Sequence, residues 1–340
     1  MAPEPGQPWE AEGVLNPAAG RTPDGRLHLL PRLVAAGNMS RIGLAEVVVD
    51  DGVPTGVRRR GVVLAPDEGW ERGAHHGGVE DPRVTFLERL GVHVMTYVAY
   101  GPLGGRIALA ISRDLETWER LGPALFAYQP GLHIDLNLYL NKDAVIFPEP
   151  IPGPDGVASY AILHRPMWHH TMSGLDGDAA LPAGLSDNRP GIWISYAPAA
   201  QVEADIRALT LLRDHRCVAL PEHPYESTKI GAGPPPLRVP EGWLLIHHGV
   251  QGRIVPGFDP SQQRDLIYSA GAMLLDAHDP SRVIARTPTP LLEPETANER
   301  VGTVPNVVFP TAIATIDSRH FVFYGMADTS IGVALLDRAP

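Results

Sequence analysis

Apolar stretches of strand length, separated by polar or glycine-containing breaks, recur along the whole chain. Five passages share one plan, in which an apolar strand, a break and a second apolar strand predict a β-hairpin. These passages begin at Arg26, His93, Ala158, Gly242 and His320. Their second strands begin near Gly43, Ile107, Ile192, Gly271 and Ile331. The repeat is irregular, mostly about 60 to 85 residues long, and only the stretch near Val202 to Leu212 has an amphipathic helical pattern.

Five similar antiparallel units are best accommodated by radial repetition around an axis, which leaves only short sheet edges. We therefore predict an all-β fold, in which residues 1–340 form a single five-bladed β-propeller with a central axial pocket. A two-sheet sandwich is the alternative, but it would not explain five hairpins of one plan. In a propeller, loops from several blades converge on one pocket, so motifs far apart in the sequence can meet there.

Composition narrows the range of partners. The formal net charge is -11, which argues against nucleic acid or an anionic membrane as the main partner. The single cysteine, Cys217, has no partner for an internal disulfide. No stretch approaches the ~20 continuous apolar residues of a membrane span, and the first residues lack the pattern of a secretion signal. The sequence therefore predicts a cytoplasmic protein.

Two lysines stand out because Lys142 and Lys229 are the only ones among 28 basic residues. Arginine offers a planar fork, whereas lysine is a compact point charge that can approach one oxyanion. Lys229 precedes Gly231 and Gly233, whose missing side chains let backbone and ligand approach closely, as in an oxyanion loop. The segment lacks the ending of a P-loop, so nucleotide binding is not favoured. The alternative is an ordinary strand-end cation.

The segment HHGGVEDPRV supplies a candidate general acid, Asp81. Pro82 should push Asp81 toward an extended conformation and aim its carboxyl group rigidly. The alternative is a turn in which Asp81 and Arg83 form a surface pair. His75 and His76 have no partners at the spacing of a metal site, so no metal is predicted.

Further polar residues close apolar strands. His164 and Arg165 end one strand and are predicted at a pocket rim, while His247 and His248 end another. Asp328 lies between two strands near the C-terminus. If the propeller gathers the basic residues on one face, charge-assisted hydrogen bonds to phosphate are their natural use. The predicted cationic set is Lys142, Arg165, Lys229 and His248.

The number and order of the motifs resemble glycoside hydrolase family 130, five-bladed propeller enzymes that include β-mannoside phosphorylases and some β-mannosidases. The matching segments are VLNPAAG, LHLLPRLV, GGVEDPRV, SRDLETWERLG, NKDAVIFPEP, LHRP, KIGAGPPPL, HHGV, YSAGAMLLD, VPNVVFPT and YGMADTSIGVAL. The resemblance implies that Asp81 is the general acid and passes its proton through a sugar hydroxyl. It also implies that Asn16, Arg32 and Asp328 hold the mannosyl unit. The implied phosphate pocket consists of Lys142, Arg165, Lys229 and His248, with Tyr268 nearby.

The chain departs from the family pattern at two positions and in one segment. Lys142 stands where some phosphorylases have arginine, which changes a bidentate fork to a point charge. Pro17 replaces a small polar residue found in some members. Residues 167–189 look like an insertion near the acceptor side, which leaves the acceptor open: glucose, N-acetylglucosamine or mannose.

The nucleophile distinguishes the possible reactions. An inverting hydrolase needs an acid and a basic carboxylate ~6.5 to 9.5 Å apart, whereas phosphate is itself an anionic nucleophile. Because Asp81 is the only acid strongly indicated, we predict inverting phosphorolysis of a β-mannoside to α-mannose 1-phosphate. Inorganic phosphate is the co-substrate, no organic cofactor is needed, and a homo-oligomer is left open. The alternatives are an inverting β-mannosidase, a retaining glycosidase and a non-catalytic sugar-binding propeller. The mannosidase would use Glu80, Glu149 or Glu226 as its base.

Overall fold

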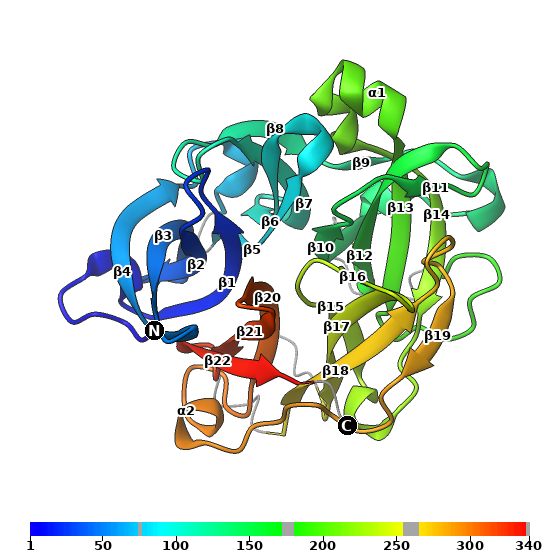
Figure 1. Cartoon of the computed structure of the whole chain (residues 1–340). Coiled ribbons are helices and arrows are strands. Elements are labelled where there is room, and N and C mark those ends of the chain that lie inside the picture. Colours follow the sequence, from blue (N-terminus) through cyan, green and yellow to red (C-terminus); the bar gives the residue numbers. More distant parts are fainter. Residues whose placement is uncertain (74–76, 172–179, 254–264, 338–340) are drawn as a thin grey trace.

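The computed structural model describes residues 1–73, 77–171, 180–253 and 265–337 and consists mainly of β-strands (Figure 1). The predicted all-β class is confirmed. Within these ranges the α-helices are α1 (Ala199–Ala204) and α2 (Ala297–Arg300). The helix expected near Val202 to Leu212 is the end of α1 followed by the 3₁₀ turn η6 (Ile206–Thr210). No helix in the described part is long and apolar enough to cross a membrane.

The first eight strands of the chain form one sheet. It contains β1 (Gly13–Arg21), β2 (Leu27–Ala35), β3 (Met39–Asp50), β4 (Val53–Leu64), β5 (Gly77–Leu87), β6 (Val92–Gly101), β7 (Gly104–Ser112) and β8 (Glu119–Pro123). The four strands β1 to β4 are antiparallel, as are β5 to β8. Among the described strands, backbone pairing between these two groups is limited to a short parallel contact, in which Met39 pairs with Gly77 and Ser40 with Gly78.

Three smaller sheets complete the chain. The first contains β9 (Leu125–Phe126), β10 (Tyr139–Ile146), β11 (Ile151–Pro152), β12 (Ala158–Thr171), β13 (Ile192–Pro198) and β14 (Leu211–Ala219). The second contains β15 (Lys229–Ala232), β16 (Leu237–Val239), β17 (Gly242–Gln251), β18 (Ile267–Leu275) and β19 (Val283–Arg286). The third contains β20 (Val308–Ile316), β21 (Arg319–Met326) and β22 (Ser330–Leu336).

All five predicted hairpins are confirmed as antiparallel pairs: β2 with β3, β6 with β7, β12 with β13, β17 with β18 and β21 with β22. In each case one further antiparallel strand precedes the hairpin: β1, β5, β10, β15 or β20. We call the resulting groups units 1 to 5: β1–β4, β5–β8, β9–β14, β15–β19 and β20–β22.

The units surround a common centre (Figure 1). Strand β1 contacts β5 and β20, β5 contacts β10, β10 contacts β15, and β17 and β18 contact β20. Each of five apolar clusters of described residues is shared by two neighbouring units. One of them closes the circle, because Phe323 of unit 5 packs in the same cluster as Leu33 of unit 1. Burial of apolar side chains between successive sheets therefore holds the units together.

The N-terminal residue crosses the same junction. The amino group of Met1 donates to the carbonyl oxygen of Ile331 at 2.8 Å, and the amide of Ile331 donates back at 2.8 Å. The start of the chain thus pairs with β22 of unit 5. Strand pairing nevertheless groups the five units into four sheets, because units 1 and 2 share a contact. Strand pairing by itself therefore does not separate five blades.

A buried glutamate repeats in the short helical turns that precede four of the units. It is the third residue of η1 (Pro8–Glu10), η2 (Gly69–Glu71), η7 (Pro224–Glu226) and α2. Each carboxylate accepts a hydrogen bond from a backbone amide near the start of its turn and another from a strand side chain. The strand partners are Arg59 for Glu10, Arg120 and Tyr97 for Glu71, His247 and Arg286 for Glu226, and Tyr324 for Glu299. This repeat was not predicted from the sequence.

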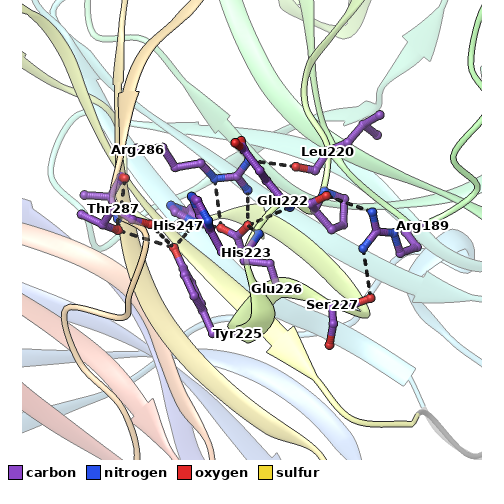
Figure 2. A network of polar contacts seen from close by, with 12 residues as sticks. Arg189, Leu220, Glu222, His223, Tyr225, Glu226, Ser227, His247, Arg286 and Thr287 are labelled. Carbon is purple, nitrogen blue, oxygen red and sulfur yellow. Dashed lines mark hydrogen bonds and ion pairs between the residues drawn. The ribbon is translucent and has the colours of Figure 1, made fainter.

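Figure 2 shows the best-connected example, Glu226. Its carboxylate accepts from His247 Nε2 at 2.8 Å and pairs with Arg286 Nη2 at 2.7 Å, and the backbone amides of Glu222 and His223 donate to it at 3.0 Å. A buried carboxylate needs several hydrogen-bond donors to replace the water it has lost. The bonds from His247 and Arg286 to Glu226 also hold η7 against β17 and β19. The other 3₁₀ turns are η3 (Glu88–Leu90), η4 (Pro130–Leu132) and η5 (Leu136–Leu138).

Candidate active site

The predicted acid, Asp81, lies on a bulge of β5, where the pairing with β6 shifts between Glu80 and Arg83. The extended conformation expected before Pro82 is wrong, because φ of Asp81 is +48°. Aspartate tolerates this left-handed region better than most residues. The bulge redirects the strand there, so tertiary contacts rather than the proline set the direction of the carboxyl group.

Two of the predicted sugar-binding residues contact Asp81 directly. Asn16 Nδ2 of β1 donates to Asp81 Oδ1 at 2.8 Å, and Arg32 Nη1 of β2 donates to the same oxygen at 3.1 Å. Arg32 also donates to Glu80 at 3.0 Å and to Ser40 at 2.8 Å. Units 1 and 2 therefore build one polar group around the carboxylate.

Burial alone would raise the pKa of the Asp81 carboxyl, but the charges of Arg32, Lys142 and Arg83 lower it below its ordinary value. The free protein therefore holds Asp81 ionised at neutral pH. Asp328 behaves in the opposite way. Burial raises the pKa of Asp328 to about 6, and the nearby carboxylates of Asp81 and Glu80 act in the same direction. The positive charges of Arg32 and Lys229 oppose this shift. Asp328 follows β21 in the turn to β22, so unit 5 also faces this group.

The predicted phosphate-binding residues come from units 3 and 4. Lys142 of β10 and Arg165 of β12 are direct partners across the strand pair, and Gly231 of β15 lies opposite His248 of β17. Lys142 Nζ is 3.5 Å from Glu80 Oε2, which links this group to the strand that carries Asp81. Lys229 Nζ lies 5.2 Å from the ring centroid of Tyr268. The structure thus brings together residues that are more than 100 positions apart in the chain.

One carboxylate that was not predicted, Asp143, organises these side chains. It accepts from Arg165 Nε at 2.6 Å and lies 3.5 Å from His248 Nε2. A side chain at position 231 would overlap Asp143 and His248, so glycine is required there for packing. The signal in the sequence was an acidic residue next to a predicted cationic one, although Asp143 pairs with Arg165 rather than with the adjacent Lys142. We call Lys142, Arg165, Lys229 and His248 the donor cluster.

Burial changes the charge of the donor cluster. Burial lowers the pKa of Lys229 to about 7, and the positive charges of Arg165 and Lys142 act in the same direction. The carboxylates of Asp143 and Asp328 oppose this shift but do not cancel it. The pKa of His248 lies well below its ordinary value, because burial and neighbouring cations outweigh Asp143. His248 is therefore a neutral donor rather than the cation that the sequence predicted. The same burial raises the pKa of the Tyr268 hydroxyl, which stays protonated.

Several donors of this region have no hydrogen-bond partner within the described part of the chain. They are the buried Arg165 Nη1, Arg83 Nη2 and His248 Nδ1, although the last can donate only in one tautomer. The alternative in which Arg83 forms a surface pair with Asp81 is wrong, because Arg83 is 1% exposed. Unmatched buried N–H groups are energetically unfavourable in a folded protein. Water or a polar ligand can satisfy these groups.

The rim position predicted for His164 is also wrong, because its side chain is buried inside unit 3. Its ring bonds Asn141 at 3.0 Å on one side and Ser195 Oγ at 2.7 Å on the other, and Ser195 bonds His215 at 2.8 Å. His215 Nε2 donates to the carbonyl oxygen of Ala127 at 2.8 Å. Successive residues of a strand face opposite sides, so His164 faces away from Arg165. This chain of bonds braces β10 next to Lys142.

The carboxylates considered as hydrolytic bases are occupied or exposed. Glu80 pairs with Arg32 at 3.0 Å, and Glu149 is exposed beyond the end of β10. Glu226 is enclosed by the network of Figure 2, where burial is outweighed by its donors and its pKa falls to about 2. None of the three is a free base positioned to activate water.

No group of three metal-binding side chains occurs among the described residues. His75 and His76, which the sequence had suggested as an incomplete metal motif, lie outside the described residues, as does part of the expected insertion.

Comparison with known proteins gives a consistent result. A family model described as beta-1,4-mannooligosaccharide phosphorylase, of glycoside hydrolase family 130, matches residues 6–339. A 1,2-beta-oligomannan phosphorylase from Thermoanaerobacter sp. (strain X514) is 32% identical over 99% of this chain and 94% of its own length.

Two solved structures share the fold. The beta-1,2-mannobiose phosphorylase from Listeria innocua, in complex with beta-1,2-mannobiose, aligns with TM-score 0.70 and 23% identity over 99% of this chain and 94% of that chain. The second structure comes from work on glycoside hydrolases of the GH130 family of mannoside phosphorylases that target beta-1,2 mannosidic linkages in Candida mannan. It aligns with TM-score 0.74 and 22% identity, over 99% of this chain and 90% of that chain. The chain therefore belongs to glycoside hydrolase family 130.

Proposed function

We propose that this protein is an inverting phosphorylase that cleaves a β-mannoside with inorganic phosphate and releases α-mannose 1-phosphate. The observation that carries the proposal is the donor cluster next to Asp81. Its buried Arg165 Nη1 has no hydrogen-bond partner within the described ranges, and burial disfavours the charge of Lys229. A phosphate ion supplies several acceptor oxygens and negative charge, which satisfies both groups.

Asp81, Asn16, Arg32 and Asp328 bind the mannosyl unit in this proposal, and the donor cluster with Tyr268 holds phosphate on the opposite face of the sugar. A phosphate oxygen forms a bond to the anomeric carbon while the bond from that carbon to the leaving oxygen breaks. Holding both reactants in place lowers the entropic part of the barrier. Inversion follows because attack and departure occur on opposite faces.

The proton balance suits a phosphorylase whose acid is ionised in the free protein. When the nucleophile is HPO₄²⁻, its proton is released as the sugar phosphate forms, and the leaving alcohol requires one. Because Asp81 is ionised in the free protein, it takes up one proton before the reaction and donates it to the leaving oxygen, through a sugar hydroxyl as the family resemblance implies. The proton lost by HPO₄²⁻ replaces the one taken up, so the overall reaction consumes no proton. Neither a metal nor an organic cofactor is required by this chemistry, and we propose that none takes part.

The hydrolytic alternative requires a second carboxylate that activates water. Glu80 and Glu226 are engaged in ion pairs, and Glu149 is exposed to solvent. These contacts favour phosphate over water as the nucleophile.

We further propose that the scissile linkage is β-1,2. The description of the family model names β-1,4-linked substrates, but the relative that aligns over 94% of its own length acts on a 1,2-beta-oligomannan. The acceptor is then mannose or a short β-1,2-mannan.

The proposed scaffold is a five-bladed propeller in which units 1 to 5 are the blades. The five shared apolar clusters and the contacts between successive units support this count. The site residues come from all five units, which supports an axial pocket as the place where they meet. The cytoplasmic location stays a prediction from the sequence.

The test is incubation of the purified protein with β-1,2-mannobiose, with and without inorganic phosphate. Phosphorus NMR should detect α-mannose 1-phosphate, and its formation should stop when phosphate is omitted. Asp81→Asn should lower turnover by about 10²- to 10⁴-fold, as expected for loss of a general acid, while its thermal unfolding temperature stays near that of the wild type. Free mannose released at an undiminished rate without phosphate would refute the proposal.

The donor cluster has its own test. Lys142→Ala and His248→Ala should each raise the KM for phosphate, by about tenfold for one lost charge-assisted hydrogen bond. Unchanged phosphate dependence in both variants would remove these residues from the phosphate site.

A further inference from the structure

Arg83 is a buried cation of β5 that lies two residues after Asp81 and is 1% exposed. Its Nη1 donates to the carbonyl oxygens of Asp81 at 2.9 Å and Pro82 at 3.3 Å. Its Nε donates to the carbonyl oxygen of Gly233 at 2.8 Å. Gly233 directly follows β15, the strand that carries Lys229. One side chain therefore ties the backbone of the acid to the segment that carries part of the donor cluster.

The surroundings of Arg83 place its charge between the two halves of the site. Its guanidinium carbon lies 5.5 Å from the ring centroid of Phe309, and the ring of His248 lies 4.5 Å from the same centroid. Burial and Arg165, opposed by Asp143 and Asp81, lower the pKa of the Arg83 guanidinium below its ordinary value. Arginine nevertheless stays charged in proteins. The buried guanidinium groups of Arg83 and Arg165 therefore repel each other electrostatically, and Asp143 is an anion that acts on both.

The third nitrogen of Arg83 is the informative one. Nη2 is buried and has no hydrogen-bond partner in the described part of the structure, although Nε and Nη1 of the same side chain are both satisfied. Arg165 has the same deficit at Nη1. A buried charged group with an unmatched donor is unfavourable by more than a neutral one. An oxyanion that accepts from both guanidinium groups removes both deficits and adds the negative charge that two adjacent cations lack.

We propose that Arg83 is a sixth phosphate-binding residue, whose Nη2 donates to an oxygen of the bound phosphate. The inference rests on the proposed function and adds a residue to its site. Because Nε and Nη1 are already committed to Gly233 and Asp81, the guanidinium group also fixes the position of the phosphate relative to the acid. Arg83 thus contacts the nucleophile and sets the separation between nucleophile and acid.

The experiment measures binding of inorganic phosphate alone, by isothermal titration calorimetry, to the full-length wild type and to Arg83→Lys and Arg83→Met. Both variants should bind phosphate more weakly by about tenfold or more, since one charge-assisted hydrogen bond is lost. Arg83→Met should be the weaker of the two because it also loses the charge. Arg207→Met is the matched control, because Arg207 is 61% exposed and pairs with Glu119 at the surface. It should leave the Kd for phosphate unchanged.

Folded Arg83 variants that bind phosphate as tightly as the wild type would overturn the inference. If neither variant folds, a crystal structure of the wild type grown with phosphate decides. A phosphate oxygen within about 3.2 Å of Nη2 supports the inference, and a phosphate bound elsewhere in the donor cluster, with Nη2 out of reach, overturns it. Product analysis of the wild type tests the proposed function separately. A wild type that forms α-mannose 1-phosphate while the Arg83 variants keep full phosphate affinity would refute this inference alone.

Discussion

Replacing Lys229 by methionine should stabilise the phosphate-free protein against unfolding at mildly acidic pH. The ammonium group is buried beside Arg165 and Lys142, and its pKa falls from 10.5 to about 7. Below about pH 7 the folded protein must hold this group charged in an unfavourable environment, whereas the unfolded chain holds it charged in water. Methionine has a similar length and removes the charge.

The magnitude follows from the two pKa values. At about 1.4 kcal/mol per pKa unit, the change from 10.5 to about 7 corresponds to a destabilisation of about 5 kcal/mol, which is an upper limit. Between these two pKa values the unfolded state binds more protons, so the stability of the wild type rises with pH. The destabilisation is complete below about pH 7 and disappears as the pH approaches 10.5. The stability difference between variant and wild type should therefore shrink by about 2 to 3 kcal/mol from pH 6 to pH 9.

The assay is urea unfolding of wild type and Lys229→Met in phosphate-free buffer, near pH 6 and near pH 9. Packing changes caused by methionine contribute equally at both pH values, so the pH dependence isolates the charge. Lys142→Met is the comparison, because its side chain remains 22% exposed and its charge is only one of several that act on Lys229, so its pH dependence should be clearly smaller. A stability difference that is the same at both pH values, or a variant that is less stable near pH 6 than near pH 9 relative to wild type, would refute the reasoning.

Three further predictions follow from the same contacts. Phosphate binding near pH 8 should be accompanied by proton uptake, because the bound anion raises the pKa of Lys229. Calorimetry in two buffers of different ionisation enthalpy measures the number of protons taken up, and a value of zero would contradict the prediction. Glu226→Gln should lower the free energy of unfolding by about 3 kcal/mol, the usual result of breaking a buried ion pair. The folded variant should keep the turnover of the wild type, and a loss of turnover would instead indicate that Glu226 is a catalytic base. Gly231→Ala should displace Asp143 and His248 and raise the KM for phosphate by at least about tenfold, and a wild-type KM would show that the overlap is absorbed elsewhere.

The sequence predicted the strands well because strand pairing leaves a local signal. Each of the five hairpins has two apolar runs and a break close together in the chain, and each is present as an antiparallel pair. The candidate site was predicted through motifs in the same way. Asn16 and Arg32 contact Asp81, whereas Lys142 lies beside Glu80 and Arg165 pairs with Asp143, which was not predicted. Their roles in catalysis stay predictions.

The errors share one physical cause. His164 and Arg165 are neighbours on β12, and His247 and His248 are neighbours on β17, so each pair faces opposite sides of its sheet. Both faces of these strands are buried against other units, and the sequence pattern therefore gives no indication of which residue faces the site. The buried glutamates were missed because their arginine and tyrosine partners lie 25 to 60 residues away.

By itself, the sequence determined the strands, their hairpin partners and the motifs that contain Asp81 and the two lysines, because these depend on neighbours along the chain. The tertiary structure alone decided the left-handed backbone of Asp81, the neutral state of His248, the lowered pKa of Lys229 and the unmatched donor of Arg83. Each of these depends on how much water is excluded and which charges from other units come close, and both quantities arise only when the sheets pack together.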